Sequence, residues 1–423
     1  MKFFTFFNLL ACGVLAVFQS LSAQVFRTES FSDRIKSLQV KVVDNWDSPP
    51  VITLEGDQWI EVSFDELNES PERYTYTLTH CNADWTVSSL VQSEYMSGFQ
   101  HMYVADYETS FNTNTDYIHY RIFFPNEDLT MKVSGNYVAR VYREGDREHP
   151  VLAACFSVVD PHATIQLNAS SITDQGANQK YQQVNFEVQY SDNRIVPLQD
   201  LKVFVLQNNR RDHWGALIKP LIIRPNQLTY HHNPALIFEA GNEYRKFEVV
   251  SFNYNGLNIE AVEWHAPYHH AIVRTDEFRA DKRYVYDEDI DGRYYVRSQD
   301  AVEYDIESDY FFAHFFLPCN QPFKEDVYML SEIFNNIADE RSKMDYSYEE
   351  KGYVKTIFLK QGHYNYMYVT KKDDSAALST VLIEGNYFPT ENEYAVYVYY
   401  RPRGERYDHL IGYKRMQFKQ GQI

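Results

Sequence analysis

Aromatic residues that alternate with polar residues at a period of two dominate this sequence. Tyrosine and phenylalanine occupy 35 and 28 of its 423 positions. The alternation is clearest in four runs, Tyr74–His80, Val184–Tyr190, Tyr364–Tyr368 and Tyr394–Tyr400. Such runs place bulky side chains on one face of an extended chain, which is typical of β-strands that bury one side. Antiparallel sandwiches are built from strands of this kind, so an all-β fold is predicted.

Helical periodicity is nearly absent. Val87–Met96 and Ser331–Ala338 could each form a short helix, and no longer amphipathic segment was found. Tandem immunoglobulin-like sandwich domains with few short helices are therefore predicted.

Proline-containing junctions divide the chain into blocks of sandwich size. Asp160 and Pro161 follow one strand-rich block, and Pro267–Ala280 leads into another. We predict domains at 24–160, 161–280 and 281–423. The similar segments Ser134–Tyr142 and Glu391–Tyr400 look like the same closing strand in different blocks, as expected for related domains in tandem.

The N-terminal residues resemble an export signal. Lys2 precedes an apolar run, Phe3–Val17, and small residues follow up to Ala23. Residues 1–23 are therefore predicted to be a signal peptide cleaved near Ala23. A signal anchor and a lipoprotein processed at Cys12 are the alternatives. No later segment is apolar enough to cross a bilayer as a helix, so the mature protein is expected to have no membrane span.

Charge argues against two classes of partner. The formal net charge is −19, and removal of Lys2 with the signal leaves −20. A surface this acidic repels phosphate backbones and anionic headgroups, so neither nucleic acid nor a bare membrane is an expected partner.

Three cysteines, Cys81, Cys155 and Cys319, follow the predicted signal. This odd number does not indicate a disulfide framework. Cys81 and Cys155 could form one bridge, or could be buried thiols that pack like small apolar residues.

One acidic loop matches the first half of a calcium-binding motif. Asp287, Asp289, Asp291 and Gly292 have the alternate spacing, but the twelfth position is Ser298 instead of the bidentate glutamate. The segment lies between aromatic strand-like residues, so Asp291 and Gly292 are interpreted as a hairpin turn.

Histidines cluster at His231 with His232, and at His265 with His269 and His270. An i, i+4 pair on a helix can share a metal ion, but Pro267 interrupts the helix that His265 and His269 would need. We therefore predict no metal site.

The sequence contains few motifs that indicate an enzyme active site. No Gly-x-Ser-x-Gly, phosphate-binding glycine loop or Cys-x-x-Cys motif occurs. The turn containing His80, Cys81, Asn82, Asp84 and Trp85 looks like a site, but Cys81 has no activating partner at a recognisable spacing. This turn is interpreted as a structural corner.

The third block is similar in layout to starch- and glycogen-binding sandwich modules. Leu330–Asn336 and Ile357–Val369 carry the similarity, but Asn336 stands where such modules have the tryptophan on which sugars stack. Phe334 and the Tyr364–Tyr368 stripe are therefore interpreted as core residues. A glycan-binding protein remains the alternative function, and a hydrolase with paired carboxylates is a third class.

Ordered segments along nearly the whole chain resemble the plug protein of the bacterial type IX secretion translocon. The segments are Pro49–Leu54, His80–Trp85, Glu94–Phe99, Phe111–Thr113, His119–Asn126, Ser134–Tyr142, Tyr286–Tyr294 and Tyr399–Tyr413. The sequence departs from the family at Phe334 and Asn336, where an aromatic pair is usual.

The resemblance implies a non-enzymatic periplasmic protein. Members of the family associate with the giant outer-membrane β-barrel of the translocon and close its periplasmic opening when the cargo-shuttling partner is absent. No catalytic residue, cofactor, metal or small-molecule substrate is expected from this resemblance. The implied partner is the outer-membrane translocon β-barrel.

Overall fold

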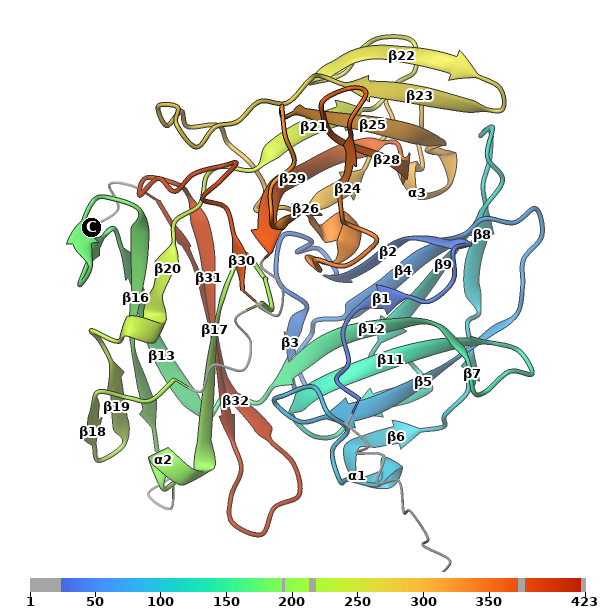
Figure 1. The fold of residues 1–423 in the computed structure, drawn as a ribbon. Coiled ribbons are helices and arrows are strands. Elements are labelled where there is room, and N and C mark those ends of the chain that lie inside the picture. The colour runs from blue at the N-terminus through green and yellow to red at the C-terminus, as the bar shows by residue number, and fades with distance from the viewer. Residues whose placement is uncertain (1–23, 192–194, 213–217, 372–376, 420–423) are drawn as a thin grey trace, which may run out of the picture.

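The computed structural model describes residues 24–191, 195–212, 218–371 and 377–419. The predicted signal peptide and Cys12 lie outside the described residues. Antiparallel β-sheets make up most of the structure and pack face to face as sandwiches, and the few helices are short (Figure 1). The all-β sandwich prediction is confirmed.

The first sandwich packs two sheets over one apolar core. One sheet has the order β1 (Glu29–Ser30), β12 (Pro150–Val159), β11 (Gly135–Arg143), β5 (Tyr74–Cys81) and β7 (Met102–Tyr103), with β3 (Val51–Thr53) parallel to β12. The other has the order β2 (Ile35–Val42), β4 (Ile60–Glu66), β9 (Ile118–Phe124) and β8 (Asp106–Thr109). A separate pair joins β6 (Met96–Gly98) to β10 (Leu129–Met131).

Period-two alternation builds this core. Tyr74, Tyr76 and Leu78 of β5 all enter it, as the sequence predicted. Phe64 and Tyr120 stack on each other with ring centroids 5.1 Å apart, and Tyr74 meets both edge-on. Aromatic pairs of this geometry add to the free energy gained by burying the rings.

The second sandwich is assembled from two distant parts of the chain. One sheet has the order β13 (Ala163–Ser170), β16 (Tyr181–Tyr190), β19 (Gln227–Tyr230) and β18 (Ile222–Arg224), with β20 (Ile237–Glu239) on β16. The other has the order β17 (Leu201–Gln207), β31 (Asn392–Tyr400) and β32 (His409–Phe418). β14 (Ile172–Thr173) and β15 (Gly176–Ala177) form a small hairpin beside it.

The third sandwich lies between β20 and β31 in the sequence. One sheet contains β21 (Arg245–Val249), β29 (Gly362–Lys371), β24 (Tyr294–Val296), β26 (Asp326–Leu330) and β30 (Leu378–Ser379). The other has the order β22 (Ile259–His265), β23 (Tyr268–Val273), β25 (Tyr310–Pro318), β28 (Gly352–Lys360) and β27 (Asp345–Ser347). β23 and β25 are parallel, and the other pairs of this sheet are antiparallel.

The strand pairing contradicts part of the predicted domain division. Residues 392–418 were assigned to the third block, but β31 pairs with β17, and Val396 and Val398 enter the core of the second sandwich. Residues 245–273 were assigned to the second block, but β21, β22 and β23 belong to sheets of the third. A strand's alternation shows that one face is buried without identifying its partner sheet. The boundary at 160 stays a prediction.

The helices are single turns: α1 (Gln92–Tyr95), α2 (Pro197–Asp200), α3 (Tyr304–Glu307), and the 3₁₀ turns η1 (Pro234–Leu236) and η2 (Glu332–Phe334). α1 and η2 lie inside the two segments for which short helices were considered. Across residues 24–191, 195–212, 218–371 and 377–419, no helix is both long and apolar enough to cross a membrane.

Candidate functional site

The seam between the first and second sandwiches is centred on a buried carboxylate. Asp408, in the loop between β31 and β32, accepts hydrogen bonds from the Ala83 backbone N–H (3.0 Å), Lys202 Nζ (3.0 Å) and Arg401 Nε (2.8 Å). Burial opposes ionisation of Asp408, but these donors hold the pKa of its carboxyl below the usual range. A charge in the second sandwich is thereby bound to the backbone of the first.

His80 lies in the same seam. It is fully buried, its Nε2 lies 3.2 Å from the Ser134 carbonyl oxygen, and its ring meets Tyr137 and Tyr407 edge-on at 5.0 and 5.2 Å. Burial lowers the pKa of His80 to about 4, so the imidazole is neutral at physiological pH. This neutral ring serves as a packing surface between the two domains.

Three of the family-like segments meet at this seam although they are far apart in the sequence. His80–Trp85 and Ser134–Tyr142 come from the first sandwich, and Tyr399–Tyr413 comes from the second. The Tyr399 hydroxyl donates to Asn136 Oδ1 at 2.8 Å, which adds a second buried link. These three segments therefore form part of a domain interface.

The seam between the first and third sandwiches contains a buried ion pair. Lys360 Nζ of β28 lies 2.7 Å from Asp65 Oδ2 of β4, and both side chains are almost completely buried. Asp65 also accepts from the Tyr310 hydroxyl (2.6 Å) and lies 2.6 Å from His119 Nδ1. Burial opposes its charge, but Lys360 and His119 keep the pKa of Asp65 below the usual range.

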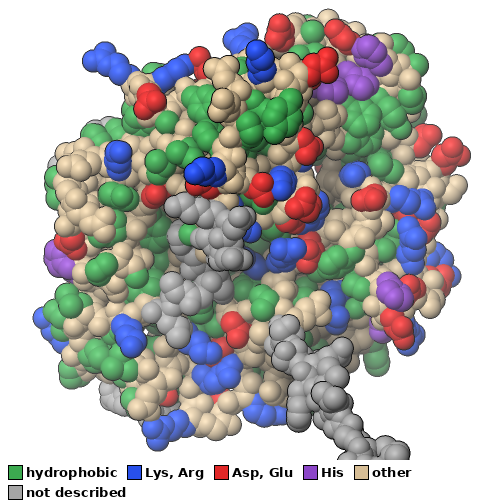
Figure 2. Space-filling model, viewed as in Figure 1, with side chains coloured by type: hydrophobic (Ala, Val, Ile, Leu, Met, Phe, Trp, Pro, Cys, Tyr) green, Lys and Arg blue, Asp and Glu red, His purple; other side chains and the backbone are tan. Residues whose placement is uncertain are grey.

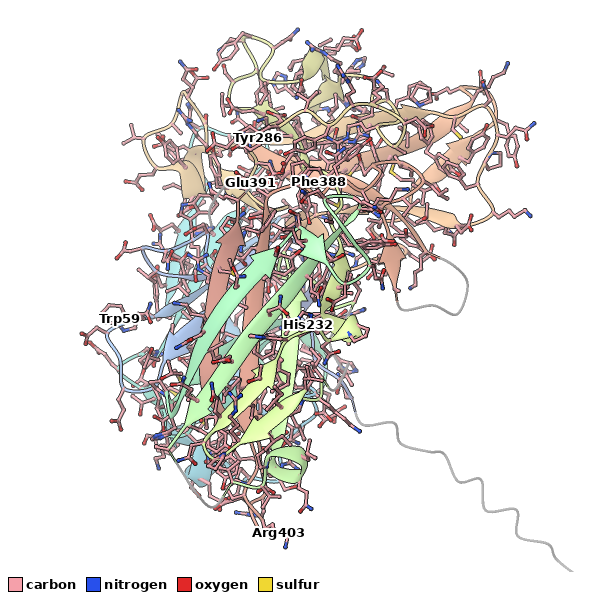
Figure 3. All side chains as sticks on the ribbon, turned by 90° about the vertical axis from the view of Figure 1, so that its left-hand side faces the viewer. Trp59, His232, Tyr286, Phe388, Glu391 and Arg403 are labelled. Atoms are coloured by element: carbon pink, nitrogen blue, oxygen red, sulfur yellow. The ribbon has the colours of Figure 1, made fainter. Side chains whose placement is uncertain are left out.

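A third polar seam joins the second and third sandwiches. Arg293 Nη2, beside β24, lies 3.0 Å from Glu393 Oε1 of β31, and both are buried. Gln417 Nε2 of β32 donates to Asp291 Oδ2 at 3.0 Å. Tyr286 and Glu391 mark this boundary in Figure 3, where the third sandwich lies above the second. All three sandwiches are thus joined by buried polar contacts, each between residues distant in the sequence.

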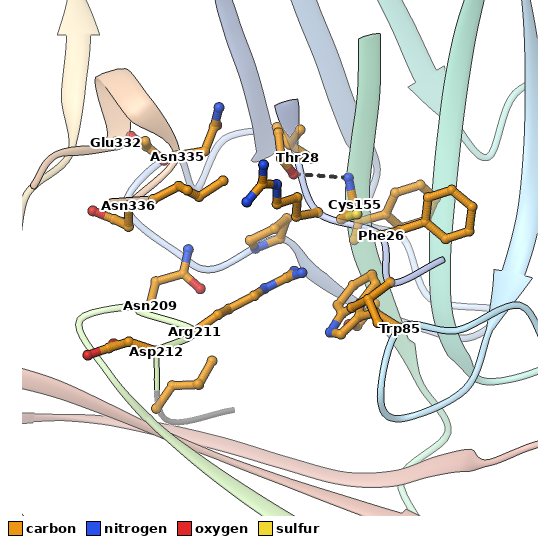
Figure 4. Close-up of a pocket in the computed structure, with 18 of the residues that line it drawn as sticks. Phe26, Thr28, Trp85, Cys155, Asn209, Arg211, Asp212, Glu332, Asn335 and Asn336 are labelled. Atoms are coloured by element: carbon orange, nitrogen blue, oxygen red, sulfur yellow. Dashed lines mark hydrogen bonds between the residues drawn. The ribbon is translucent and has the colours of Figure 1, made fainter. Parts of the chain in front are cut away.

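A cavity of about 400 Å³ lies where the three sandwiches meet (Figure 4). Phe26 and Trp85 come from the first sandwich, Arg211 follows β17 of the second, and Asn336 follows η2 of the third. The Arg211 guanidinium lies over the Trp85 ring at 3.9 Å. The buried Asn336 Oδ1 has no hydrogen-bond partner among the described residues. The cavity is therefore a feature of the junction and not of any one domain.

Comparison with known families assigns the first sandwich to a described protein family. A family model described as the type 9 secretion system plug protein 1st domain matches residues 35–160. These residues include all of the first sandwich except β1. The chain is a type IX secretion plug-like protein.

A solved structure is similar over almost the whole plug-like chain. It is the crystal structure of a hypothetical protein from Parabacteroides merdae ATCC 43184, with 45% sequence identity and a TM-score of 0.92. The similarity covers 93% of this chain and 100% of that one. The similarity therefore extends across all three sandwiches. A search of curated proteins found no match.

The acidic loop of the plug-like protein is held by internal contacts. Asp287 Oδ1 lies 2.6 Å from Lys246 Nζ, Asp289 accepts from the Tyr244 and Asp291 backbone N–H groups, and Asp291 faces Gln417. Asp291 and Gly292 have positive φ angles of 52° and 82° and form a turn into β24, but the chain before them is not a strand. The turn was predicted correctly and the hairpin was not.

His265 and His269 lie on opposite faces of the β22–β23 hairpin, so they cannot share a metal ion. Trp264 is opposite His269 on one face of the β22–β23 hairpin, whereas His265 and His270 share the other face with ring centroids 5.0 Å apart. His232 Nδ1 contacts Asp174 at 2.8 Å on the exposed side of the second sandwich (Figure 3), and His231 lies beside it in the sequence. Within the described ranges, no three His, Cys, Asp or Glu residues are grouped so that they could hold a metal ion.

The aromatic residues of the third block that resemble a glycan-binding module lie in the core. Phe334, Tyr364, Tyr366 and Tyr368 are at most 7% exposed and pack in the third core. They cannot form an open platform for sugar rings.

The three cysteines do not form a disulfide. Cys81 and Cys155 are unpaired buried thiols in a small apolar cluster that includes Trp85, and Cys319 is also a free thiol.

One buried carboxyl leads to a pH-dependent prediction. Burial, with a smaller effect from the nearby Glu391 and Asp291 carboxylates, raises the pKa of Glu243 from 4.5 to about 7. Between pH 4.5 and about 7, the folded state therefore keeps a proton on Glu243 that the unfolded state releases. The free energy of unfolding falls as the pH rises through this window. Glu243→Gln keeps an acceptor for the Tyr284 hydroxyl and removes the charge.

We expect Glu243→Gln to match the wild type near pH 4 and to be more stable at pH 8 by on the order of 3 kcal/mol. Urea denaturation from pH 4 to pH 8 measures the difference. Glu349→Gln, at an exposed position, should show little change at any pH. A stability difference for Glu243→Gln that does not vary with pH would contradict this prediction.

Proposed function

We propose that the protein is a periplasmic, non-enzymatic plug that reversibly closes the periplasmic opening of the large outer-membrane barrel of the type IX translocon. The family match to the first domain carries this proposal. No catalytic residue, cofactor or small-molecule substrate has a role in it.

The seams support the proposal physically. A barrel wide enough for folded cargo would leak solutes when idle, so a stopper must keep its shape against the opening. Lys360–Asp65, the Asp408 contacts and Arg293–Glu393 join the three sandwiches through buried groups. Such networks oppose domain motion because opening a seam would leave a charge without its partner.

Affinity purification tests the partnership directly. Tagged protein isolated from detergent-solubilised outer membranes should recover the translocon barrel, and recovery should increase in cells that lack the shuttle partner. A tagged periplasmic protein of similar size and charge is the control. Failure to recover the barrel even without the shuttle partner would overturn the proposal.

Deletion of the gene tests the closing function separately. Cells that lack the protein should become sensitive to large antibiotics that the outer membrane normally excludes, but only while barrels stand without the shuttle partner. Re-expression should restore resistance. Unchanged sensitivity in cells whose barrels are demonstrably unoccupied would show that the protein does not seal them.

A further inference from the structure

An imidazole pair lies on the outward face of the third sandwich. Ala271, Phe311, Ala313 and Phe315 of β23 and β25 point into the core, so the residues between them, including His270 and His314, point away from it. Figure 2 shows histidines beside hydrophobic side chains on this part of the surface, at the upper right.

The two rings are arranged to share one small ligand. His270 Nδ1 lies 2.7 Å from His314 Nε2, and the ring planes are inclined by only 13°. Two ring nitrogens at this distance can share only one proton, since two N–H groups pointing at each other would repel. A divalent metal ion can replace that proton and accept both lone pairs.

We propose that His270 and His314 form a two-imidazole chelate for a borderline divalent transition metal ion of the zinc type. Imidazole nitrogens suit zinc, copper and nickel, whereas magnesium and calcium prefer oxygen ligands. Zn–N distances of about 2.0–2.1 Å in tetrahedral geometry place two ligand nitrogens about 3.3 Å apart. The pair would therefore open by about 0.6 Å, which small rotations of two partly exposed side chains supply.

Neighbouring groups orient the chelate. Thr356 Oγ1 lies 3.0 Å from His314 Nδ1, so the nitrogen that is not facing His270 already has a partner. Ligating histidines are commonly held in this way through their second ring nitrogen. Phe312 stacks on His270 at 5.2 Å and restricts that ring. Among the described residues no third His, Cys, Asp or Glu is grouped with the pair, so water molecules would complete the shell.

Calorimetric titration of the tag-free, chelator-treated processed chain with Zn²⁺ tests the site, with Mg²⁺ as the control metal. One Zn²⁺ should bind per chain at this site and Mg²⁺ should not. His270→Ala and His314→Ala should each weaken binding by more than about tenfold, because loss of an outer-shell partner alone costs about 10–100-fold. Thr356→Val should weaken it by about tenfold without removing a ligand.

His269→Ala is the matched control. His269 is adjacent in the sequence but stacks on Phe252 at 3.9 Å on the opposite face, so its loss should leave Zn²⁺ affinity unchanged. Circular dichroism of each variant confirms that it is folded. The proposal is overturned if folded His270→Ala and His314→Ala bind Zn²⁺ as the wild type does, or if His269→Ala loses as much affinity as they do. Neither result would bear on the proposed plug function.

Discussion

Replacing Lys360 with methionine is expected to lower the free energy of unfolding by about 3 kcal/mol or more. Methionine keeps an unbranched stem of similar length but removes the charge that lies 2.7 Å from Asp65 Oδ2. Asp65 is fully buried, so without Lys360 its charge is left, among the described residues, with His119 and Tyr310 as hydrogen-bonding partners. Breaking one side of a buried pair costs more than the net contribution of the intact pair. Chemical denaturation followed by intrinsic fluorescence measures the loss.

Lys343→Met is the matched control. Lys343 Nζ lies 2.8 Å from Asp326 Oδ2, but these side chains are 31% and 45% exposed. Exposed pairs contribute about 0–1 kcal/mol, so this variant should lose little stability. Equal losses in the two variants would show that burial of the Lys360 pair has no special consequence for the domain seam.

The second large effect is expected at Gly135. An added Cβ at this position would lie 2.3 Å from His80 Nε2 and 3.1 Å from the Asp408 carbonyl oxygen. The His80 ring is fully buried between Tyr137 and Tyr407 and has little room to move. Gly135→Ala should therefore destabilise the protein by about 3 kcal/mol or more, because overpacking adds to the strain of a positive φ angle.

Gly145→Ala separates these two contributions. Gly145 also has a positive φ angle, 87°, but an added Cβ there meets nothing within 4 Å. Its replacement should cost about 1 kcal/mol from backbone strain alone. The excess loss in Gly135→Ala then measures the clash at the seam, and equal losses would mean that the seam accommodates the methyl group.

Local sequence patterns predicted individual strands well. The alternation in Val184–Tyr190 and Tyr394–Tyr400 identified β16 and β31, and their apolar side chains enter one core. The physical reason is that a half-buried strand must repeat at period two whatever its partner. The same reasoning could not place β31 beside β17, because alternation carries no information on the partner sheet.

The polar seams were not predicted. Asp65 is followed by Glu66 and Lys360 ends a run that also contains Lys355, and nothing in these neighbours links the two residues. A charge at an inward position of a strand is a signal that a buried partner exists, but the partner's identity follows only from the tertiary fold. The Asp287–Gly292 and His265–His270 patterns are visible in the sequence because their spacings are local, although neither places its residues as the motif requires.

The inserted position of the third sandwich sets the order in which the chain can fold. Leu201 at the start of β17 pairs with Tyr400 near the end of β31, so the second sheet of the second sandwich cannot close until the C-terminal strands are present. As the chain is synthesised from its N-terminus, the first and third sandwiches have all their strands earlier, while β17 is an uncovered edge. Folding of the second sandwich therefore requires closure of a long loop that already contains a folded domain, which predicts slow completion and a need for protection from aggregation until the last strand arrives.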